Sequence, residues 1–496
     1  YIEMKNNTKI KKSYTFDDVL LVPSHSEVLP SKVDVSTNIT SNIEIKIPII
    51  SAAMDTVTEN KMAISIAREG GLGVIHKNMS IEKQVKEITK VKRAESGIIL
   101  DPVTISPDKT LKDAISIMKN HEISGLPVLD HNEKILGILT DRDIRFESNL
   151  DQLVSQVMTK DLITASEGTT LNKAKSILQK NRIEKLLIVD KNKKLKGMVT
   201  VRDVLMKEKF PNASLDTHGR LLCAAAIGVS NDLEDRALEL VSAGVDILVL
   251  DSAHGHSQGV LDSVEKIKRK FPEIPLIAGN IATSEGMKSL ISKGADAVKV
   301  GIGAGASCTT RIVSGVGVPQ FSAILDCIKI SKDSKIPIIS DGGIRFSGDM
   351  AKALGAGAHS VMLGNLLAGL DESPGELLLH DGRQHKVFRG MGSLGPMKDG
   401  TADRYFQEGV EGIKLVPEGV EGLVPYRGSL NSVIFQLIGG LKSSMGYTGS
   451  KNLKIFRNNS KFIKISSASY AEGHPHDLRI VEDAPNYQPK DNYREL

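Results

Sequence analysis

The chain has 496 residues, of which 40% are hydrophobic and 25% are charged. This composition is typical of globular proteins, and the length allows about two to four domains. A formal net charge of +4 and only 4% aromatic residues argue against nucleic-acid binding. No apolar run reaches about 18 residues, which excludes a membrane span. With three widely spaced cysteines and no apolar signal-like stretch near residue 1, the sequence predicts a cytoplasmic protein.

Eight apolar, β-branched runs separated by helix-length segments occupy both ends of the chain. They are IPIISAAM (47–54), GLGVIH (71–76), LLCAAAIGV (221–229), DILVLDSA (246–253), PLIAGNIA (275–282), AVKVGIG (297–303), IPIISDGG (336–343) and SVMLGN (360–365). Near-continuous apolar strands alternating with helices indicate a parallel sheet buried on both faces. Eight such units predict a (β/α)8 TIM barrel. A doubly wound open sheet is the alternative, and it fits worse because no GxGxxG motif opens a helix after an early strand.

An internal repeat separates the second run from the third. Residues 110–144 and 170–204 align without a gap at an offset of 60. Each copy predicts a helix, two strands joined by a turn, and the start of a second helix. We therefore expect a paired module at 96–208, inserted into a barrel that is formed by 1–95 and 209–496.

The two copies resemble the tandem cystathionine-β-synthase (CBS) module, also called a Bateman domain, through their GILTDRD and GMVTVRD ends. That resemblance implies a regulatory adenine nucleotide, with its ribose held by Thr140, Asp143, Thr200 and Asp203. Threonine and aspartate before a helix are equally explained as N-caps, so both interpretations stay open.

Polar residues and glycine turns follow several of the eight runs, where barrel enzymes carry their chemistry. Asp251 and Asp341 are candidates to accept hydrogen bonds from ribose hydroxyls. The turns in SDGGIRFSGD and MLGNLLAG suit a phosphate, although glycine is also ordinary in such turns. Together they favour a nucleotide substrate with a dinucleotide partner.

Cys308 lies in a loop of small residues after the sixth run, KVGIGAGASCTTRIVSGVG (299–317). A thiol held open at the barrel rim can attack an electrophilic carbon, and Arg311 is a candidate for activating it. Cys223 stands in an apolar run and Cys327 in a helix-like segment, so we interpret both as core residues.

Motifs along nearly the whole chain resemble the bacterial inosine-5'-monophosphate (IMP) dehydrogenase family. They include TFDDVLLVP, SAAMDTVTE, GLGVIHKNMS, DSAHGHS, GIGAGASCTTRIVSGVGVPQ, DGGIRFSGD, RYFQ and VPEGVEG. The resemblance implies NAD-dependent oxidation of IMP to xanthosine monophosphate, in guanine nucleotide synthesis. It further implies that Cys308 attacks the purine C2, that hydride leaves to NAD, and that water hydrolyses the thioimidate after a mobile flap replaces NADH.

The resemblance also implies roles for individual residues. Catalysis is assigned to Cys308, Thr310, Arg404 and Tyr405, with Arg404 as the water-activating base. Substrate binding is assigned to Asp341, Gly343, Gly364, Asn365, Met391, Gly392, Glu418, Met54, Ala306, Ser307 and Phe388. NAD binding is assigned to Asp251, Ser252, Ala253, His254, Asn280, Gly301 and Gly303.

The same resemblance implies a potassium ion held by carbonyls of Gly303, Gly305 and Cys308, completed by Glu472, Gly473 and His474 of a neighbouring subunit in a homotetramer. The glycine-rich, charged stretch at about 381–449 is predicted to be the mobile flap. A segment this long outside secondary structure is usually functional in a compact domain.

The chain departs from the family's usual GIGPGSICTTR loop at Ala304, Ala306 and Ser307 and has Phe388 in place of a tyrosine. Two hydrogen bonds to the IMP phosphate are therefore expected to be missing, unless Ser307 supplies one. This predicts a raised Michaelis constant for IMP with the chemistry retained. Ala304 replaces a proline and makes the loop less preorganised.

Two other functions compete with this interpretation. One is guanosine monophosphate (GMP) reductase, which shares the barrel and the loop cysteine but typically lacks the insert and the RYFQ flap. The other is a sensor, in which a degenerate barrel carries an adenine-nucleotide-binding CBS pair. The altered phosphate residues favour the sensor, and the intact catalytic set weighs against it.

Overall fold

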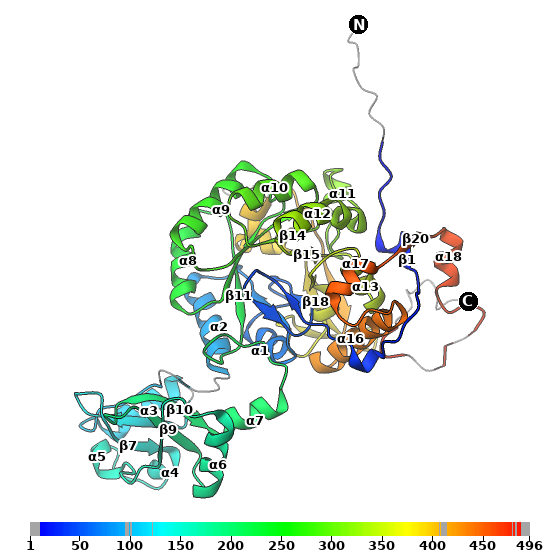
Figure 1. The fold of residues 1–496 in the computed structure, drawn as a ribbon. Helices are drawn as coiled ribbons and strands as arrows, with labels where there is room; N and C mark the ends of the chain where they lie inside the picture. The colour runs from blue at the N-terminus through cyan, green and yellow to red at the C-terminus, as the bar shows by residue number, and fades with distance from the viewer. Residues whose placement is uncertain are drawn as a thin grey trace. The chain divides into compact units, whose positions relative to one another are not determined.

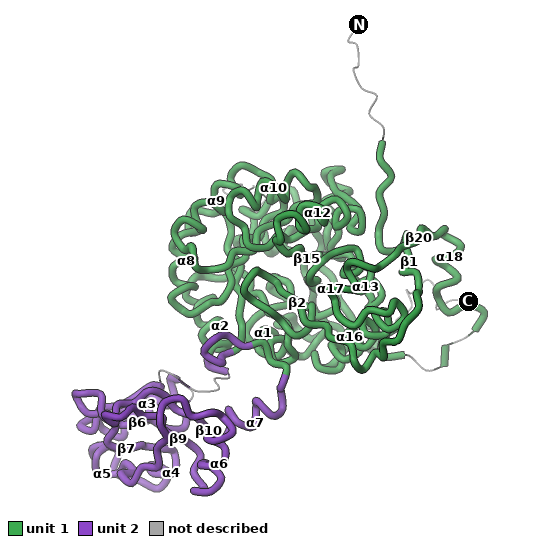
Figure 2. Tube along the Cα trace, viewed as in Figure 1, with its two compact units in different colours: residues 1–92, 212–214, 221–496 green, residues 93–211, 215–220 purple. Residues whose placement is uncertain are grey.

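The computed structural model describes residues 10–94, 99, 102–121, 123–405, 407, 414–478, 480–481 and 484–487. Contacts divide the chain into two compact units (Figure 2). The barrel unit comprises Tyr1–Lys92, Asn212–Ser214 and Leu221–Leu496, and the repeat unit comprises Arg93–Pro211 and Leu215–Arg220. In the described part of the chain, no helix is both long and apolar enough to cross a membrane.

Eight parallel strands close into a barrel, as the eight apolar runs predict (Figure 1). In chain order they are β4 (Ile49–Ser51), β5 (Leu72–Ile75), β11 (Cys223–Ile227), β12 (Ile247–Asp251), β13 (Leu276–Ile281), β14 (Ala297–Val300), β15 (Ile338–Asp341) and β16 (Ser360–Leu363). β16 pairs with β4, which closes the sheet and rules out the doubly wound alternative. Buried side chains such as Ile50, Val74, Ala224, Val249 and Ile339 pack together in one cluster of the core, so the centre is filled.

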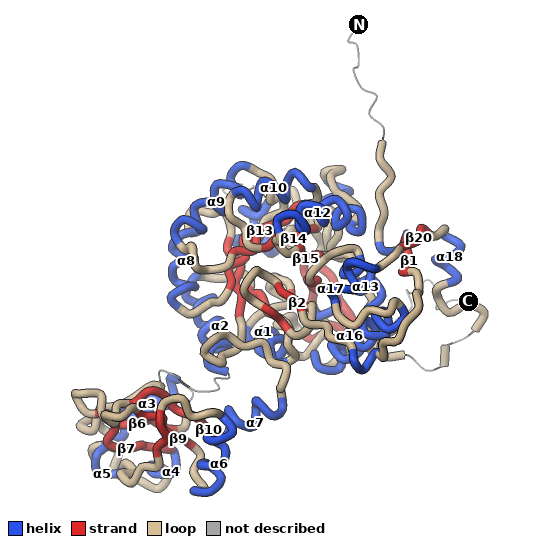
Figure 3. Tube along the Cα trace, in the orientation of Figure 1, coloured by secondary structure: helices blue, strands red, loops and turns tan. Residues whose placement is uncertain are grey.

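Helices surround the strands of the barrel (Figure 3). They are α1 (Asn60–Arg68), α2 (Ile81–Ala94), α8 (Leu233–Ser242), α9 (Gln258–Lys270), α10 (Ser284–Ser292), α12 (Gln320–Ser334), α13 (Ser347–Gly355) and α16 (Leu430–Tyr447). Short helices α11 (Thr310–Val313) and α14 (Asn365–Ala368) begin in the loops after β14 and β16. The repeat unit is inserted between α2 and β11, that is, between the second and third barrel strands.

Part of the predicted flap, residues 381–449, belongs to the barrel wall. Helix α16 packs against α13 and α1 and buries Leu430, Ile434, Leu437 and Leu441. It thereby takes the position of the eighth barrel helix. The sequence did not predict this helix, because the interior glycines Gly439 and Gly440 weaken its helical signal.

The chain between β16 and α16 builds a separate layer on the barrel. Its sheet contains β17 (Leu377–His380), β18 (Arg383–Arg389) and β19 (Glu421–Pro425), with β18 in the centre. Between β18 and β19 lie α15 (Leu394–Pro396), η3 (Met397–Thr401) and η4 (Ala402–Tyr405). We call residues 397–405 the η3–η4 segment.

The remaining elements of the barrel unit come from the ends of the chain. They are η1 (Phe16–Asp18), β1 (Val19–Leu21), η2 (Pro30–Lys32), β2 (Thr37–Asn38), β3 (Glu44–Ile45), α17 (Leu453–Asn459), β20 (Phe462–Lys464) and α18 (Ser467–Glu472). β1 pairs with β20, so the N-terminal and C-terminal segments lie side by side.

The repeat unit contains the two copies that the offset of 60 predicts. The first has α3 (Leu111–His121), β6 (Gly125–Leu129), β7 (Ile135–Thr140) and α4 (Asp141–Ile144), followed by α5 (Val154–Val157). The second has β8 (Thr164–Ser166), α6 (Leu171–Asn181), β9 (Lys185–Val189), β10 (Leu195–Thr200) and α7 (Val201–Lys209). Corresponding helices and strands begin 60 residues apart, and each copy has its own apolar core.

Candidate functional site

A buried lysine lies between the carboxylates at the ends of two barrel strands. Lys299, on β14, is only 2% exposed. Its Nζ donates to Asp251 Oδ1 at 2.8 Å, to Asp341 Oδ2 at 2.7 Å and to Asn280 Oδ1. Asn280 Nδ2 in turn donates to Asp341 Oδ2 at 3.0 Å and to the Gly301 carbonyl at 2.7 Å. The carboxyl ends of four neighbouring strands are thus joined by one charged network.

Lys299 was not among the site residues predicted from the sequence, although the sequence contains a signal for it. A lysine inside the otherwise apolar run AVKVGIG is costly to bury unless charged partners surround it. Asp251 and Asp341, which the sequence did identify, are those partners.

The thiol of Cys308 lies in the loop after β14 and is half-buried. It donates to Thr310 Oγ1 across 3.1 Å, and Thr310 begins α11. Arg311 does not contact the thiol among the described hydrogen bonds; its guanidinium donates to the carbonyls of Ile302 and Val318. Arg311 therefore holds the two ends of the loop together.

The two other cysteines are enclosed in the fold. Burial raises the pKa of Cys223 to about 12, and burial also raises the pKa of Cys327 to about 12. Such thiols stay protonated at neutral pH and are poor nucleophiles. Cys308 is the one cysteine of the chain that is not fully buried.

Three backbone segments stack beside Cys308. Thr309 N donates to the Glu418 carbonyl at 2.8 Å, and Val420 N donates to the Ser307 carbonyl at 2.9 Å. Glu418 N donates to the Gly392 carbonyl at 2.9 Å. Residues 307–309, 418–420 and 390–392 therefore form one small layer, which brings Met391, Gly392 and Glu418 to the thiol although the sequence separates them.

Glycine turns pack closely against this layer and against each other. Gly301 lies against the Asp341 carbonyl, where an added Cβ would overlap it. A Cβ at Gly342 would lie 3.1 Å from Ala304 Cβ, so the turn after β15 touches the Cys308 loop. Gly364 lies against the Met54 thioether. Glycine therefore allows close approach at these rim positions, and at Gly301 the Asp341 carbonyl leaves no space for a side chain.

Gly343 and Asn365 stand beside these turns. Gly343 has a φ of 79°, in the left-handed region that favours glycine. Asn365 is the first residue of α14. Gly303, with a φ of 72°, lies under the Arg311 side chain. The Gly305 carbonyl accepts the Cys308 N–H at 3.1 Å.

The η3–η4 segment lies on the strand ends that carry Asp251. The Arg404 guanidinium forms an ion pair with Asp251 Oδ2, and Ala253 N donates to the Arg404 carbonyl at 3.0 Å. Arg404 Nε is buried without a hydrogen-bond partner among the described residues. A buried polar group without a partner is costly, so an acceptor at this nitrogen would be stabilising.

Tyr405 fills the space above Gly392. A Cβ at Gly392 would lie 2.5 Å from Tyr405 Cζ, so the ring depends on glycine at that position. Burial raises the pKa of the Tyr405 hydroxyl, and the neighbouring Arg404 partly opposes that shift. The hydroxyl therefore stays protonated at neutral pH.

The remaining residues of the predicted NAD stretch differ in their surroundings. Ser252 is buried, and its hydroxyl donates to the Gly279 carbonyl at 3.0 Å. His254 is exposed and lies edge-on to His256. Ser252 therefore faces the interior, whereas Asp251 and Ala253 contact the η3–η4 segment and His254 lies at the surface.

The altered phosphate positions have distinct environments. Ala306 is exposed, whereas Ser307 is 8% exposed and its hydroxyl lies over Gly390. Phe388 is buried in β18. The neighbouring Arg389 N donates to Thr56 Oγ1 at 3.3 Å, which ties β18 to the loop after β4. Because the Ser307 hydroxyl faces another part of the protein, it is poorly placed to compensate for Ala306.

The predicted partner-subunit ligands stand at the other end of the chain. Glu472 ends α18, which contacts η1, and the His474 ring lies 3.0 Å from the Tyr487 hydroxyl. Among the described residues, no cluster of three or more histidine, cysteine, aspartate or glutamate side chains could hold a metal.

In the repeat unit, the four predicted nucleotide residues form helix caps. Thr140 Oγ1 donates to Asp143 Oδ2 at 2.7 Å, and Thr200 Oγ1 donates to Asp203 Oδ2 at 2.7 Å. The same aspartates accept from the backbone N–H of the two threonines. Both pairs are capping boxes, so these residues cap helices at both positions, as the N-cap interpretation of the sequence predicts.

A closed parallel barrel that carries a thiol, paired carboxylates and glycine turns at one rim defines a TIM-barrel enzyme. Residues 13–476 match the profile of the IMP dehydrogenase / GMP reductase domain. The chain belongs to that family.

Curated relatives are similar over nearly their full length. Inosine-5'-monophosphate dehydrogenase of Aquifex aeolicus (strain VF5) is 56% identical, over 97% of this chain and 98% of the relative. The enzyme of the same name from Bacillus subtilis (strain 168) is 54% identical, over 96% of this chain and 98% of the relative.

A solved structure of a GMP reductase variant from Trypanosoma brucei, in complex with guanosine 5'-monophosphate, is also similar. It is 39% identical with a TM-score of 0.85, and the match covers 95% of this chain and 99% of that one. A gap as long as the repeat unit would not allow this coverage. The expectation that a reductase lacks the insert is therefore wrong for this relative, and the insert cannot separate the two activities.

Proposed function

We propose that this protein oxidises IMP to xanthosine monophosphate with NAD, for guanine nucleotide synthesis. The observation that carries the proposal is the position of the η3–η4 segment, which brings Arg404 to Asp251 and Tyr405 to Gly392 beside Cys308. Oxidation of a purine at C2 ends with addition of water, so a site for hydrolysis must be built over the thiol. A reductive deamination adds no water and has no need of such a site.

The chemistry divides into two halves around Cys308. Its sulfur attacks C2 of IMP, and the hydride from C2 leaves to NAD, which supplies the oxidising power. Water then replaces sulfur at C2, giving xanthosine monophosphate and the free thiol, with one proton released overall. Thr310, 3.1 Å from the sulfur, accepts the thiol hydrogen bond. The unpartnered Arg404 Nε supports a place for the attacking water beside the guanidinium, and Tyr405 supports that group.

Residues of the rim fit the proposed substrate contacts. Among the described residues, both hydrogen bonds of Asp341 reach Oδ2, which leaves Oδ1 for a ribose hydroxyl. The turns at Gly343, Gly364 and Asn365 supply backbone N–H groups for the phosphate. We assign Met54, Met391, Gly392 and Glu418 to the base, since the last three lie in the layer beside the thiol.

For NAD, we assign Asp251, Ser252, Ala253, His254, Asn280, Gly301 and Gly303. The Asp251 carboxylate at the rim fits a ribose, because it can accept hydrogen bonds from the ribose hydroxyls. In the present conformation the Arg404 guanidinium pairs with the Asp251 carboxylate, and the Arg404 carbonyl accepts a hydrogen bond from Ala253 N. NAD and the η3–η4 segment therefore compete for one place, which supports hydrolysis after NADH has left.

A potassium ion is the second proposed cofactor. Backbone carbonyls of Gly303, Gly305 and Cys308 are oxygen donors of the kind that replaces the hydration shell of this ion. Glu472, Gly473 and His474 of a neighbouring subunit would complete the shell in a homotetramer. Arg311, which joins the two ends of the loop through the Ile302 and Val318 carbonyls, would keep these carbonyls in place.

For the repeat unit we propose a CBS pair that binds an adenine nucleotide. Capping already engages Thr140, Asp143, Thr200 and Asp203, but each threonine hydroxyl and carboxylate can accept further hydrogen bonds from a ribose. The unit would then act as a regulatory domain of a cytoplasmic enzyme.

Incubation of the protein with IMP, NAD and potassium chloride tests the activity. Xanthosine monophosphate and NADH should form in equal amounts, and mass spectrometry of the quenched protein should show a nucleotide on Cys308. Consumption of GMP and NADPH without reaction of IMP would establish the reductase. A folded protein that forms no adduct with either nucleotide would favour the sensor.

Restoring the phosphate contacts should lower the Michaelis constant for IMP. Each added hydroxyl can gain about 1.5–3 kcal/mol from a bond to the charged phosphate, so Ala306→Ser and Phe388→Tyr should each lower the constant by roughly tenfold or more. Ala306 is exposed and accepts a hydroxyl without a clash. Initial rates at varied IMP measure the effect. Unchanged constants in both variants would contradict the assignment of these positions to the phosphate.

A further inference from the structure

A buried ion pair joins the barrel rim to the η3–η4 segment, next to the proposed catalytic residues. Lys77 follows β5, and its Nζ lies 2.6 Å from Asp403 Oδ1 and 2.8 Å from Asp403 Oδ2. The side chains are only 11% and 4% exposed. Asp403 immediately precedes Arg404, so this contact sets where the Arg404 backbone lies.

The pair rests on a glycine of a third strand. Gly228 directly follows β11 and is buried. A Cβ at this position would overlap Asp403 Oδ2 and would lie 2.8 Å from Lys77 Nζ. The φ of Gly228 is not in the left-handed region, so its backbone would accept alanine. Glycine at position 228 therefore leaves the space that the ion pair fills.

We propose that Lys77 and Asp403 form a latch that holds the η3–η4 segment over Cys308, and that Gly228 provides the space in which the latch closes. This inference rests on the proposed function. None of the three residues contacts the reacting atoms in this assignment; they are positioning residues that act through Arg404 and Tyr405.

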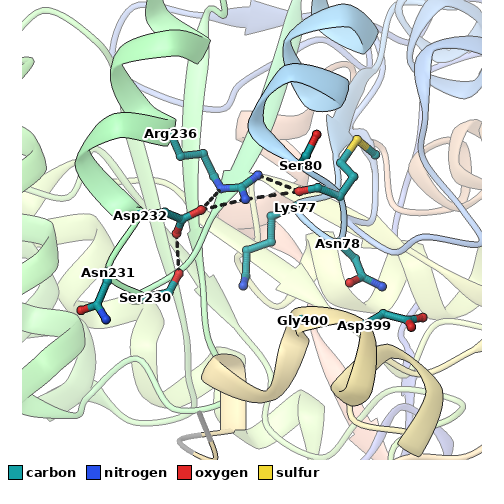
Figure 4. A pocket seen from close by; sticks show the side chains of 10 residues that line it. Lys77, Asn78, Ser80, Ser230, Asn231, Asp232, Arg236, Asp399 and Gly400 are labelled. Atoms are coloured by element: carbon teal, nitrogen blue, oxygen red, sulfur yellow. Dashed lines mark hydrogen bonds and ion pairs between the residues drawn. The ribbon is translucent and has the colours of Figure 1, made fainter. Parts of the chain in front are cut away.

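The surroundings of Lys77 and Asp403 differ, so loss of one partner should cost more than loss of the other. Lys77 also lines a cavity of about 480 Å³ together with Ser230, Asp232 and Asp399, and Figure 4 shows its side chain pointing toward the turn at Gly400. Without Asp403, the ammonium group still has this polar cavity. Without Lys77, the nearly enclosed Asp403 carboxylate would be left uncompensated, which is the costlier loss.

The latch predicts opposite effects on the two halves of the reaction. Arg404 and NAD compete for Asp251 and Ala253, so a weaker latch shifts the equilibrium from the docked segment toward bound NAD. Hydride transfer should continue, hydrolysis should slow, and the Michaelis constant for NAD should fall. A variant that merely damaged the fold would not bind NAD better.

The experiment compares Lys77→Met, Asp403→Asn and Gly228→Ala in the full chain, with IMP, NAD and potassium. Rapid mixing measures the first turnover of NADH, and steady-state assays give kcat and the Michaelis constant for NAD. Gly259→Ala in α9 is the matched control, because a Cβ there meets nothing within 4 Å. Circular dichroism checks that each variant is folded.

We expect Lys77→Met to keep the NADH burst while kcat falls by about tenfold or more and the Michaelis constant for NAD falls several-fold. Asp403→Asn and Gly228→Ala should also lower kcat and the Michaelis constant for NAD, by smaller factors. Gly259→Ala should behave as the wild type. If Lys77→Met does not fold, Gly228→Ala decides alone, since it leaves both charges in place.

Unchanged constants in folded Lys77→Met and Gly228→Ala would overturn the latch. It would also be overturned if burst and kcat fell together with no fall in the Michaelis constant for NAD. Absence of an NADH burst in the wild type would instead reject the proposed function, whatever the variants do.

Discussion

Replacing Cys308 with alanine should lower NADH formation from IMP and NAD by about 10³-fold or more, since no covalent route remains once the nucleophile is lost. The fall should appear in kcat, because the residues assigned to IMP stay in place. Absorbance at the NADH band measures the rate, and mass spectrometry of the quenched protein should find no nucleotide adduct.

Cys327→Ala is the matched control for this loss. That thiol lies inside α12 with a pKa raised to about 12 by burial, so its removal should leave the adduct on Cys308 intact. A nucleotide adduct that persists in Cys308→Ala would show that another group is the nucleophile and would reject the assignment.

Replacing Lys299 with methionine should destabilise the barrel by about 3–5 kcal/mol, the usual cost of removing one partner from a buried ion pair. Methionine fills nearly the same space, but Asp251 and Asp341 then lose their common cation. Arg404 still pairs with Asp251, so the larger loss falls on Asp341, whose ion pair in the described part of the chain is with Lys299. Urea unfolding followed by circular dichroism measures the change in the transition midpoint.

Lys270→Met provides the comparison for this effect. Lys270 pairs with Glu234 at 2.9 Å on the surface, where both side chains are about a third exposed or more, so its removal should barely move the midpoint. In the double variant Lys299→Met/Asp341→Asn, part of the lost stability should return. A midpoint for Lys299→Met equal to that of the wild type would show that the network does not depend on the lysine charge.

The order of strands and the place of the insertion were predictable because each barrel strand is buried on both faces. A run such as DILVLDSA has no polar alternation, and the polar group at its end, Asp251, marks where the strand reaches the rim. The duplicated copies were equally visible, since an offset of 60 places the starts of α3, β6, β7 and α4 on those of α6, β9, β10 and α7.

Helix α16 was missed because the local sequence and the tertiary environment disagree. Glycine inside Leu430–Tyr447 and the loop-rich residues before it suggested a continuous flap. Packing of Leu437 and Leu441 in the core overrides that weak local preference. Helical propensity alone does not show that the barrel needs its eighth helix at this position.

By itself, the sequence determined the barrel and the inserted repeat, because burial patterns and spacing are local and periodic, and it predicted Cys308 as the candidate nucleophile. Only the tertiary structure decided which charges meet. Lys299 between Asp251 and Asp341, Lys77 on Asp403 above Gly228, and Ser307 turned toward Gly390 join residues from separate strands and loops. Such contacts depend on how the strand ends converge in space, and spacing along one chain does not contain that information.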